Sequence, residues 1–100
     1  MNLQRAGGLI LPQLFKIAGY TIYFWAKEDG EPIHVHISPG KPSQNATKIW
    51  ITRSGGTIVA HNRSKIPEIK LRYLRKIVGT EYLNICNKWE LFIGNLNFYC

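Results

Sequence analysis

The chain has 100 residues and a net charge of +7, from 13 Lys and Arg against six Asp and Glu. Hydrophobic residues make up 45% and charged residues 19%, which excludes a disordered chain and leaves room for one small core. No apolar run approaches the ~18 residues that cross a bilayer, and Met1–Phe15 lacks the features of a signal peptide. Two cysteines, Cys86 and Cys100, are too few for a disulfide framework. We therefore expect a cytoplasmic protein with no membrane partner.

Alternating apolar residues predict a small antiparallel sheet of about four strands within residues 14–61. Aromatic and β-branched residues at 20–26 predict a strand, and the acidic turn at 28–32 connects it to a second strand at 33–38. In that second strand, alternation places one set of residues on each face: Ile33, Val35 and Ile37 on one, and His34, His36 and Ser38 on the other. Residues 47–52 and 57–60 predict two more strands, and residues 14–17 can add an edge strand.

The last third predicts two helices, at residues 64–79 and 81–93. We expect Ser64 to be the N-cap of the first helix and Gly79 its C-cap, and we expect Gly94 to end the second. Strands followed by helices indicate a single α+β domain over residues 1–100, with flexible tails at 1–13 and 95–100. Two helices cover only one face of a small sheet, so we expect the other face to be open unless a partner covers it.

His34 and His36 are the candidate catalytic or metal-binding residues. Residues two apart on a strand share a face, with Cα atoms about 6.5–7 Å apart, so both imidazoles can reach one metal ion such as zinc. The third ligand would come from His61, Glu31 or Glu90, and no cofactor is otherwise expected. Alternatively, one neutral and one protonated imidazole can cleave RNA by acid–base chemistry. The remaining alternative is a structural role in a loop contact or an interface.

Basic residues predict a nucleic-acid contact between Lys41 and Lys76, where nine cations face only Glu68. If the cluster binds phosphate groups, its affinity should weaken strongly as salt is raised. The alternative is that these side chains form a solvated helical face that binds nothing. If Trp50 shares the open face with the histidines, it can stack on bases. The candidate residues are Lys48, Arg63, Lys65, Arg72, Arg75, Lys76 and Trp50.

The chain resembles a bacterial family, the domain of unknown function 4160. The most specific element is Pro-x-His-x-His after an aromatic strand, here Pro32-Ile33-His34-Val35-His36. The aromatic strand, a Lys-x-Trp strand and a final Trp-containing helix match at residues 17–25, 47–50 and 89–94. The chain departs at Ile33, where the family usually has a second proline, and at Thr47, where it usually has alanine. Members often occur beside another short gene, which implies a toxin–antitoxin or mobile-element module with a partner protein or nucleic acid.

Three functions follow from these observations. The favoured one is a small basic module that binds a cognate partner protein and RNA or DNA without catalysis. The second is a phosphodiesterase or ribonuclease that uses His34 and His36, with or without metal. The third is a structural homodimer with the histidines in its interface.

Overall fold

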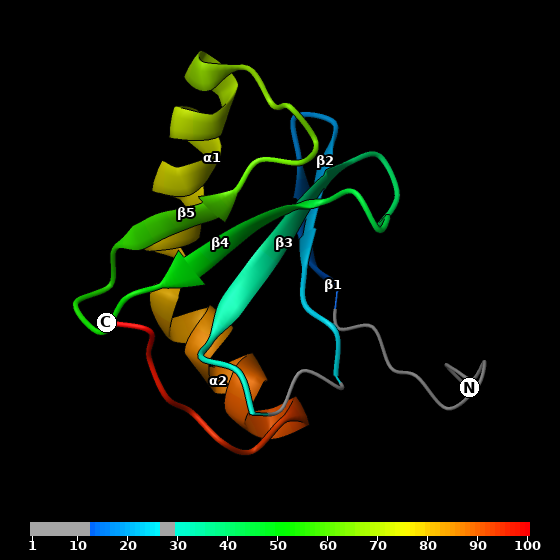
Figure 1. Cartoon of the computed structure of the whole chain (residues 1–100). Helices are drawn as coiled ribbons and strands as arrows, with labels where there is room; N and C mark the ends of the chain where they lie inside the picture. The colour runs from blue at the N-terminus through cyan, green and yellow to red at the C-terminus, as the bar shows by residue number, and fades with distance from the viewer. Residues whose placement is uncertain (1–12, 27–29) are drawn as a thin grey trace.

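A computed structural model describes residues 13–26 and 30–100 of the chain. Five antiparallel strands form one sheet in chain order, followed by two helices (Figure 1). The strands are β1 (Gln13–Ile17), β2 (Tyr20–Tyr23), β3 (His34–Pro39), β4 (Thr47–Ile51) and β5 (Thr57–His61), and the helices are α1 (Glu68–Thr80) and α2 (Tyr82–Phe92). The predicted α+β class is confirmed, with the edge strand β1 bringing the total to five.

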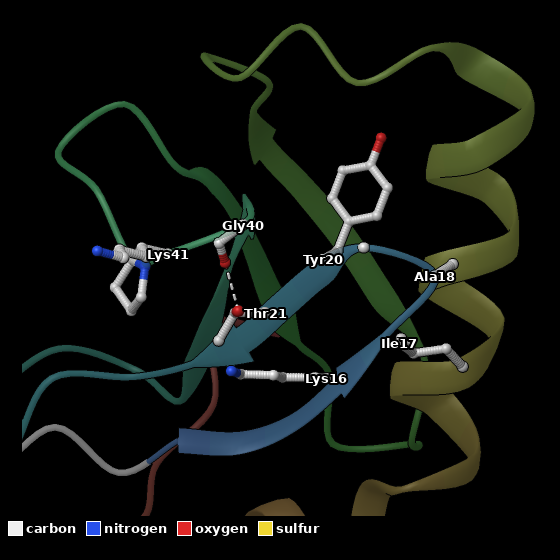
Figure 2. Close-up of a pocket in the computed structure, with 9 residues that line it drawn as sticks. Lys16, Ile17, Ala18, Tyr20, Thr21, Gly40 and Lys41 are labelled. Atoms are coloured by element: carbon white, nitrogen blue, oxygen red, sulfur yellow. Dashed lines mark hydrogen bonds between the residues drawn. The ribbon is translucent and has the colours of Figure 1, made fainter.

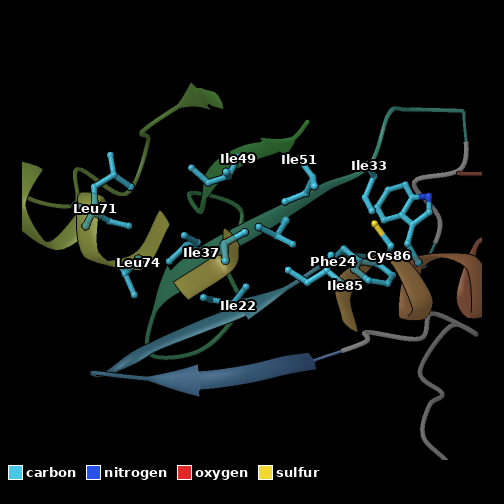
Figure 3. Packing of buried hydrophobic residues seen from close by; sticks show 14 residues of the cluster. Ile22, Phe24, Ile33, Ile37, Ile49, Ile51, Leu71, Leu74, Ile85 and Cys86 are labelled. Atoms are coloured by element: carbon cyan, nitrogen blue, oxygen red, sulfur yellow. The ribbon is translucent and has the colours of Figure 1, made fainter. Parts of the chain in front are cut away.

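The helices pack on one face of the sheet and enclose the core (Figure 3). The alternation predicted for β3 is confirmed on this side, because Ile33, Val35 and Ile37 are all fully buried in the core. Their partners on β4 and on α1 include Ile49 and Leu74, which are equally buried. The core therefore fixes which residues of β3 and β4 lie on the opposite face.

The first helix begins at Glu68, four residues after the predicted N-cap. Ser64 does not cap it, because its hydroxyl instead donates to the carbonyl of Asn45 at 2.7 Å. Ile66 precedes Pro67, and a residue before proline is disfavoured in helical conformation, so the helix starts only after the proline. The Asn62 side chain takes over the role of closing the loop, since its amide accepts from the Ile66 N–H at 3.0 Å and donates to the Ile66 carbonyl at 2.9 Å.

The two helices meet at a single residue, Glu81, rather than at a glycine cap. Gly79 lies within α1, close to the β4–β5 turn, and a Cβ built on it would lie in ordinary van der Waals contact with the Gly55 carbonyl, at 3.6 Å. Gly94 ends the second helix as predicted, with a φ of +89° that favours glycine. Within the described parts of the chain, no helix is long and apolar enough to cross a membrane.

After α2 the C-terminal segment, residues 95–100, runs back along the end of the sheet (Figure 1). Backbone hydrogen bonds of 2.9 Å join Ile33 N–H to the Asn97 carbonyl and Arg53 N–H to the Cys100 carbonyl. Leu96 and Phe98 pack against the core. The flexibility predicted for this segment stays a prediction, and the tail predicted at 1–13 lies, except for Gln13 in β1, outside the described residues.

Candidate functional site

The face of the sheet opposite the helices, here called the outer face, carries the predicted histidine pair. Strand pairing aligns Tyr23 of β2 with His36 of β3, His36 with Lys48 of β4, and Lys48 with His61 of β5. The next row along the strands pairs His34 with Trp50, and Trp50 with Ile58. Directly paired residues on one face have neighbouring side chains, so the sheet brings together groups from four strands.

His34 is fully buried, which corrects the expectation that both imidazoles lie on an open surface. Its ring centroid lies 5.3 Å from that of Trp89 on α2, 5.6 Å from Trp50 and 5.0 Å from His36. The C-terminal segment fixes this arrangement, because the Trp89 indole N–H donates to the Asn95 carbonyl at 2.9 Å. Substrate therefore has no direct route to the His34 ring in this structure.

A backbone contact fixes the tautomer of His34. Its Nδ1 lies 2.9 Å from the carbonyl oxygen of Pro32. A carbonyl oxygen can only accept, so Nδ1 carries the hydrogen and Nε2 is the basic nitrogen of the neutral ring. The Pro-x-His element thus positions the first histidine through the proline carbonyl two residues before it.

The β3–β4 loop covers another part of the outer face. The Tyr23 hydroxyl lies 3.2 Å from both the backbone N and the carbonyl oxygen of Ser43, and the Ser38 hydroxyl donates to the Lys41 carbonyl at 2.6 Å. Between this loop and the C-terminal segment, part of the outer face stays accessible. We call this part the outer-face window; its residues are His36, Lys48, Trp50, Ile58 and His61.

Lys48 lies at the centre of the outer-face window. Its Nζ is 2.6 Å from Glu31 Oε1, and it is also 4.3 Å from the centroid of the Trp50 ring. Tyr99 stacks on Trp50 with ring centroids 4.9 Å apart and planes within 4°. The stacking surface of Trp50 is therefore already in use, and the exposed aromatic ring on this side is Tyr99, with 57% of its surface accessible.

The charge state of His61 depends on its basic neighbours. Burial lowers its pKa from the ordinary 6.5, and the positive charges of Arg63 and Lys48 and the nearby His36 lower it further. His61 Nδ1 is buried and has no hydrogen-bond partner among the described residues. At neutral pH this ring is neutral, and an anion placed beside it would favour protonation.

The proposed metal ligands do not assemble. Among residues 13–26 and 30–100, no group of three His, Cys, Asp or Glu side chains is arranged to hold a metal ion. Of the three candidates for a third ligand, Glu31 pairs with Lys48 instead. His34 and His36 are neighbouring rings, and metal binding by this pair stays a prediction.

The predicted basic residues of α1 lie away from the outer-face window. Arg72, Arg75 and Lys76 are on α1, where they and Thr57 line a hollow of about 230 Å³ beside β5. Arg75 is committed to the fold, since its guanidinium donates to the side chain and the carbonyl of Thr57, each at 2.9 Å. Arg72 pairs with Glu68 at 3.2 Å. The predicted nucleic-acid residues thus form two groups, on opposite layers of the fold, with Arg63 and Lys65 in the loop between β5 and α1.

Sequence reasoning missed Tyr99 and the ion pair of Glu31. The alternation of Leu96 and Phe98 with polar neighbours is a period-two signal that indicates an extended, half-buried segment. No local signal predicts that Glu31 reaches Lys48, because Glu31 lies in the segment before β3 and Lys48 lies in β4, and only the folded sheet brings them together.

A family model described as "Domain of unknown function (DUF4160)" matches residues 19–90, which confirms the resemblance that the sequence showed. No curated protein and no solved structure matches the chain. All residues of the outer-face window lie inside the matched stretch, whereas Tyr99 lies beyond it.

Proposed function

The chain belongs to the family described as domain of unknown function DUF4160, and from its geometry we propose that it is a non-catalytic module that binds single-stranded nucleic acid through the outer-face window. The observation that carries this proposal is the cross-strand row of His36, Lys48 and His61 beside the exposed ring of Tyr99. Single-strand binders combine cations that follow the backbone with aromatic rings on which bases stack.

Each group in the window has a role in this proposal. Lys48 supplies the phosphate contact, and its ion pair with the partly exposed Glu31 can exchange for a phosphate oxygen without uncovering a buried charge. A phosphate beside His61 would raise the lowered pKa of that ring and so favour its protonated form. Tyr99, backed by Trp50, offers its free face to a base. None of these three contacts depends on base edges, so we expect little sequence preference.

The binding test is fluorescence anisotropy of labelled single-stranded RNA and DNA at about 50 mM salt, followed by a salt series. We expect binding whose logarithm falls linearly with the logarithm of salt concentration. The double variant Lys48→Gln, Tyr99→Ala should lose most of the affinity, while Arg72→Gln, Lys76→Gln, which removes two cations from the helix layer, should retain it. If the protein does not bind at low salt, the proposal is refuted. If only the α1 variant loses affinity, the nucleic acid binds at α1 and the outer-face window is not the site.

A partner protein of toxin–antitoxin or mobile-element type is the second half of the proposal. Both helices expose large apolar side chains, which are Ile69 on α1 and Leu83 and Leu91 on α2. A partner protein can bury apolar side chains that a helix layer exposes. Light scattering tests whether the partner is a second copy, since a monomer at high concentration refutes the homodimer.

The alternative function is a histidine-dependent phosphodiesterase, and the close approach of the His34 and His36 rings favours it. His36 is half-buried and borders the tautomer-fixed His34, at 5.0 Å between ring centroids. In such an enzyme His36 would take the proton of the 2′-hydroxyl as that oxygen attacks phosphorus, a second acid in the window would protonate the leaving 5′-oxygen, and His34 would be a positioning residue. Cleavage of RNA that His36→Ala abolishes in a folded variant would support the enzyme over the binding module.

A further inference from the structure

A separate pocket lies on the outer face beyond the β3–β4 loop. It has a volume of about 490 Å³, within the range of roughly 300–1,000 Å³ typical of small-ligand sites. Its walls are the β1–β2 turn and the start of the β3–β4 loop (Figure 2). None of its lining residues belongs to the outer-face window, so the pocket and the window are distinct.

The charge of the pocket comes from two lysines. Lys16 of β1 and Lys41 of the loop line it, and no acidic residue does. Figure 2 shows Lys16, Thr21 and Lys41 on the same side of the pocket, with both ammonium groups directed away from Ala18 and the turn. Neither lysine forms an ion pair with a carboxylate of the described residues. Two exposed ammonium groups that the described carboxylates leave unpaired favour the binding of an anion in the pocket.

The walls of the pocket are locked together. The Gly40 N–H donates to the Gly19 carbonyl at 2.9 Å, and the Thr21 hydroxyl donates to the Gly40 carbonyl. Three backbone positions are left-handed, with φ of +52° at Ala18, +84° at Gly19 and +70° at Gly40. An alanine in this region is strained, and such strain persists only where the surroundings hold it. A pocket held in this way needs little ordering when a ligand enters, which lowers the cost of binding.

We propose that this pocket binds a phosphate monoester. The monoester carries close to two negative charges at neutral pH, which match the two lysines, and three acceptor oxygens for their N–H groups. The aliphatic walls from Ile17 and Pro42 accommodate the group that bears the phosphate. Two kinds of ligand carry such a phosphate. One is a free phosphorylated metabolite of nucleotide size, and the other is a nucleic-acid strand with a 5′-phosphate at its end.

The test is a titration of ¹⁵N-labelled protein with adenosine monophosphate, with adenosine and potassium chloride at matched ionic strength as controls. We expect saturable shifts of the Thr21, Gly40 and Lys41 amide signals with the monophosphate and none with the controls. Lys16→Ala, Lys41→Ala should weaken binding at least ten-fold, and the matched Lys70→Ala, Lys76→Ala, which removes two exposed cations of α1, should not. Equal shifts with adenosine, or equal binding by the Lys16/Lys41 double variant, overturn the proposal.

A second arm separates the two sources and keeps this pocket distinct from the window. A strand with a 5′-phosphate should bind at least ten-fold more tightly than the same strand with a 5′-hydroxyl if the pocket holds strand ends. Monophosphate binding with equal affinity for both strands assigns the pocket to a free ligand. Lys48→Gln should leave monophosphate binding unchanged. The pocket proposal and the window proposal can therefore each fail while the other stands.

Discussion

Replacing Lys48 with glutamine removes the central cation of the outer-face window and keeps most of the side-chain length. In the protein, Lys48 Nζ lies 2.6 Å from Glu31 Oε1 and 4.3 Å from the Trp50 ring centroid. Because the Glu31 side chain is 43% exposed, solvent screens the ion pair, and we assign it about 0.5 kcal/mol. The cation–π contact contributes about 0.5 kcal/mol more. The free energy of unfolding should therefore fall by about 1 kcal/mol, which lowers Tm by roughly 4–8 °C for a domain of this size.

The same substitution should also weaken binding. Each phosphate contact to a single strand contributes about −0.7 to the slope of log K against log salt, so one lost contact makes the slope about 0.7 shallower and lowers affinity about five-fold at ~0.1 M salt. Fluorescence anisotropy between about 50 and 200 mM salt measures both quantities, and circular dichroism confirms the fold. Lys70→Gln removes an exposed cation of α1 and is the matched control. An unchanged slope in folded Lys48→Gln, or an equal loss in Lys70→Gln, would refute this reasoning.

Three further predictions concern stability. Burial and then Arg63 lower the pKa of His61 from 6.5, so the unfolded chain binds the proton more readily than the folded protein. Stability should therefore fall as pH drops below 6.5. In thermal melts at a series of pH values, His61→Gln should flatten this fall. Leu74→Ala leaves a cavity in the core and should cost about 2–5 kcal/mol in urea unfolding; a loss below 1 kcal/mol would contradict its full burial. Asn62→Ala removes both contacts to Ile66 and should cost about 2 kcal/mol, with Asn62→Asp, which keeps the acceptor, losing less by the same measurement.

The sheet and its two faces could be predicted from local patterns. Alternation in β3 places Val35 and Ile37 in the core because side chains on a strand point to opposite faces, whatever the rest of the fold does. Gly94 likewise ends α2 for a local reason, its left-handed backbone. Ser64 failed as an N-cap because the decisive residue was Pro67, which restricts the residue before it more strongly than a hydroxyl favours a helix start.

The candidate site was harder to predict, because segments distant in sequence decide its exposure. His34 lies on the same face of β3 as His36, yet Trp89 and the C-terminal segment bury His34. Trp50 lies on the predicted face, but Tyr99 stacks on it and takes over the exposed position. Alternation predicts the face on which a side chain lies; only the packing of the whole chain determines whether that face is covered.

The position of bound nucleic acid tests the central proposal most directly. Chemical-shift mapping of ¹⁵N-labelled protein during titration with a short single-stranded oligonucleotide locates the contact residue by residue. We predict that the largest changes fall on the amides of His36, Lys48, His61 and Tyr99, and that they shrink as salt is raised. Changes confined to Arg72 and Lys76 on α1, with the outer-face signals unmoved at saturation, would contradict it.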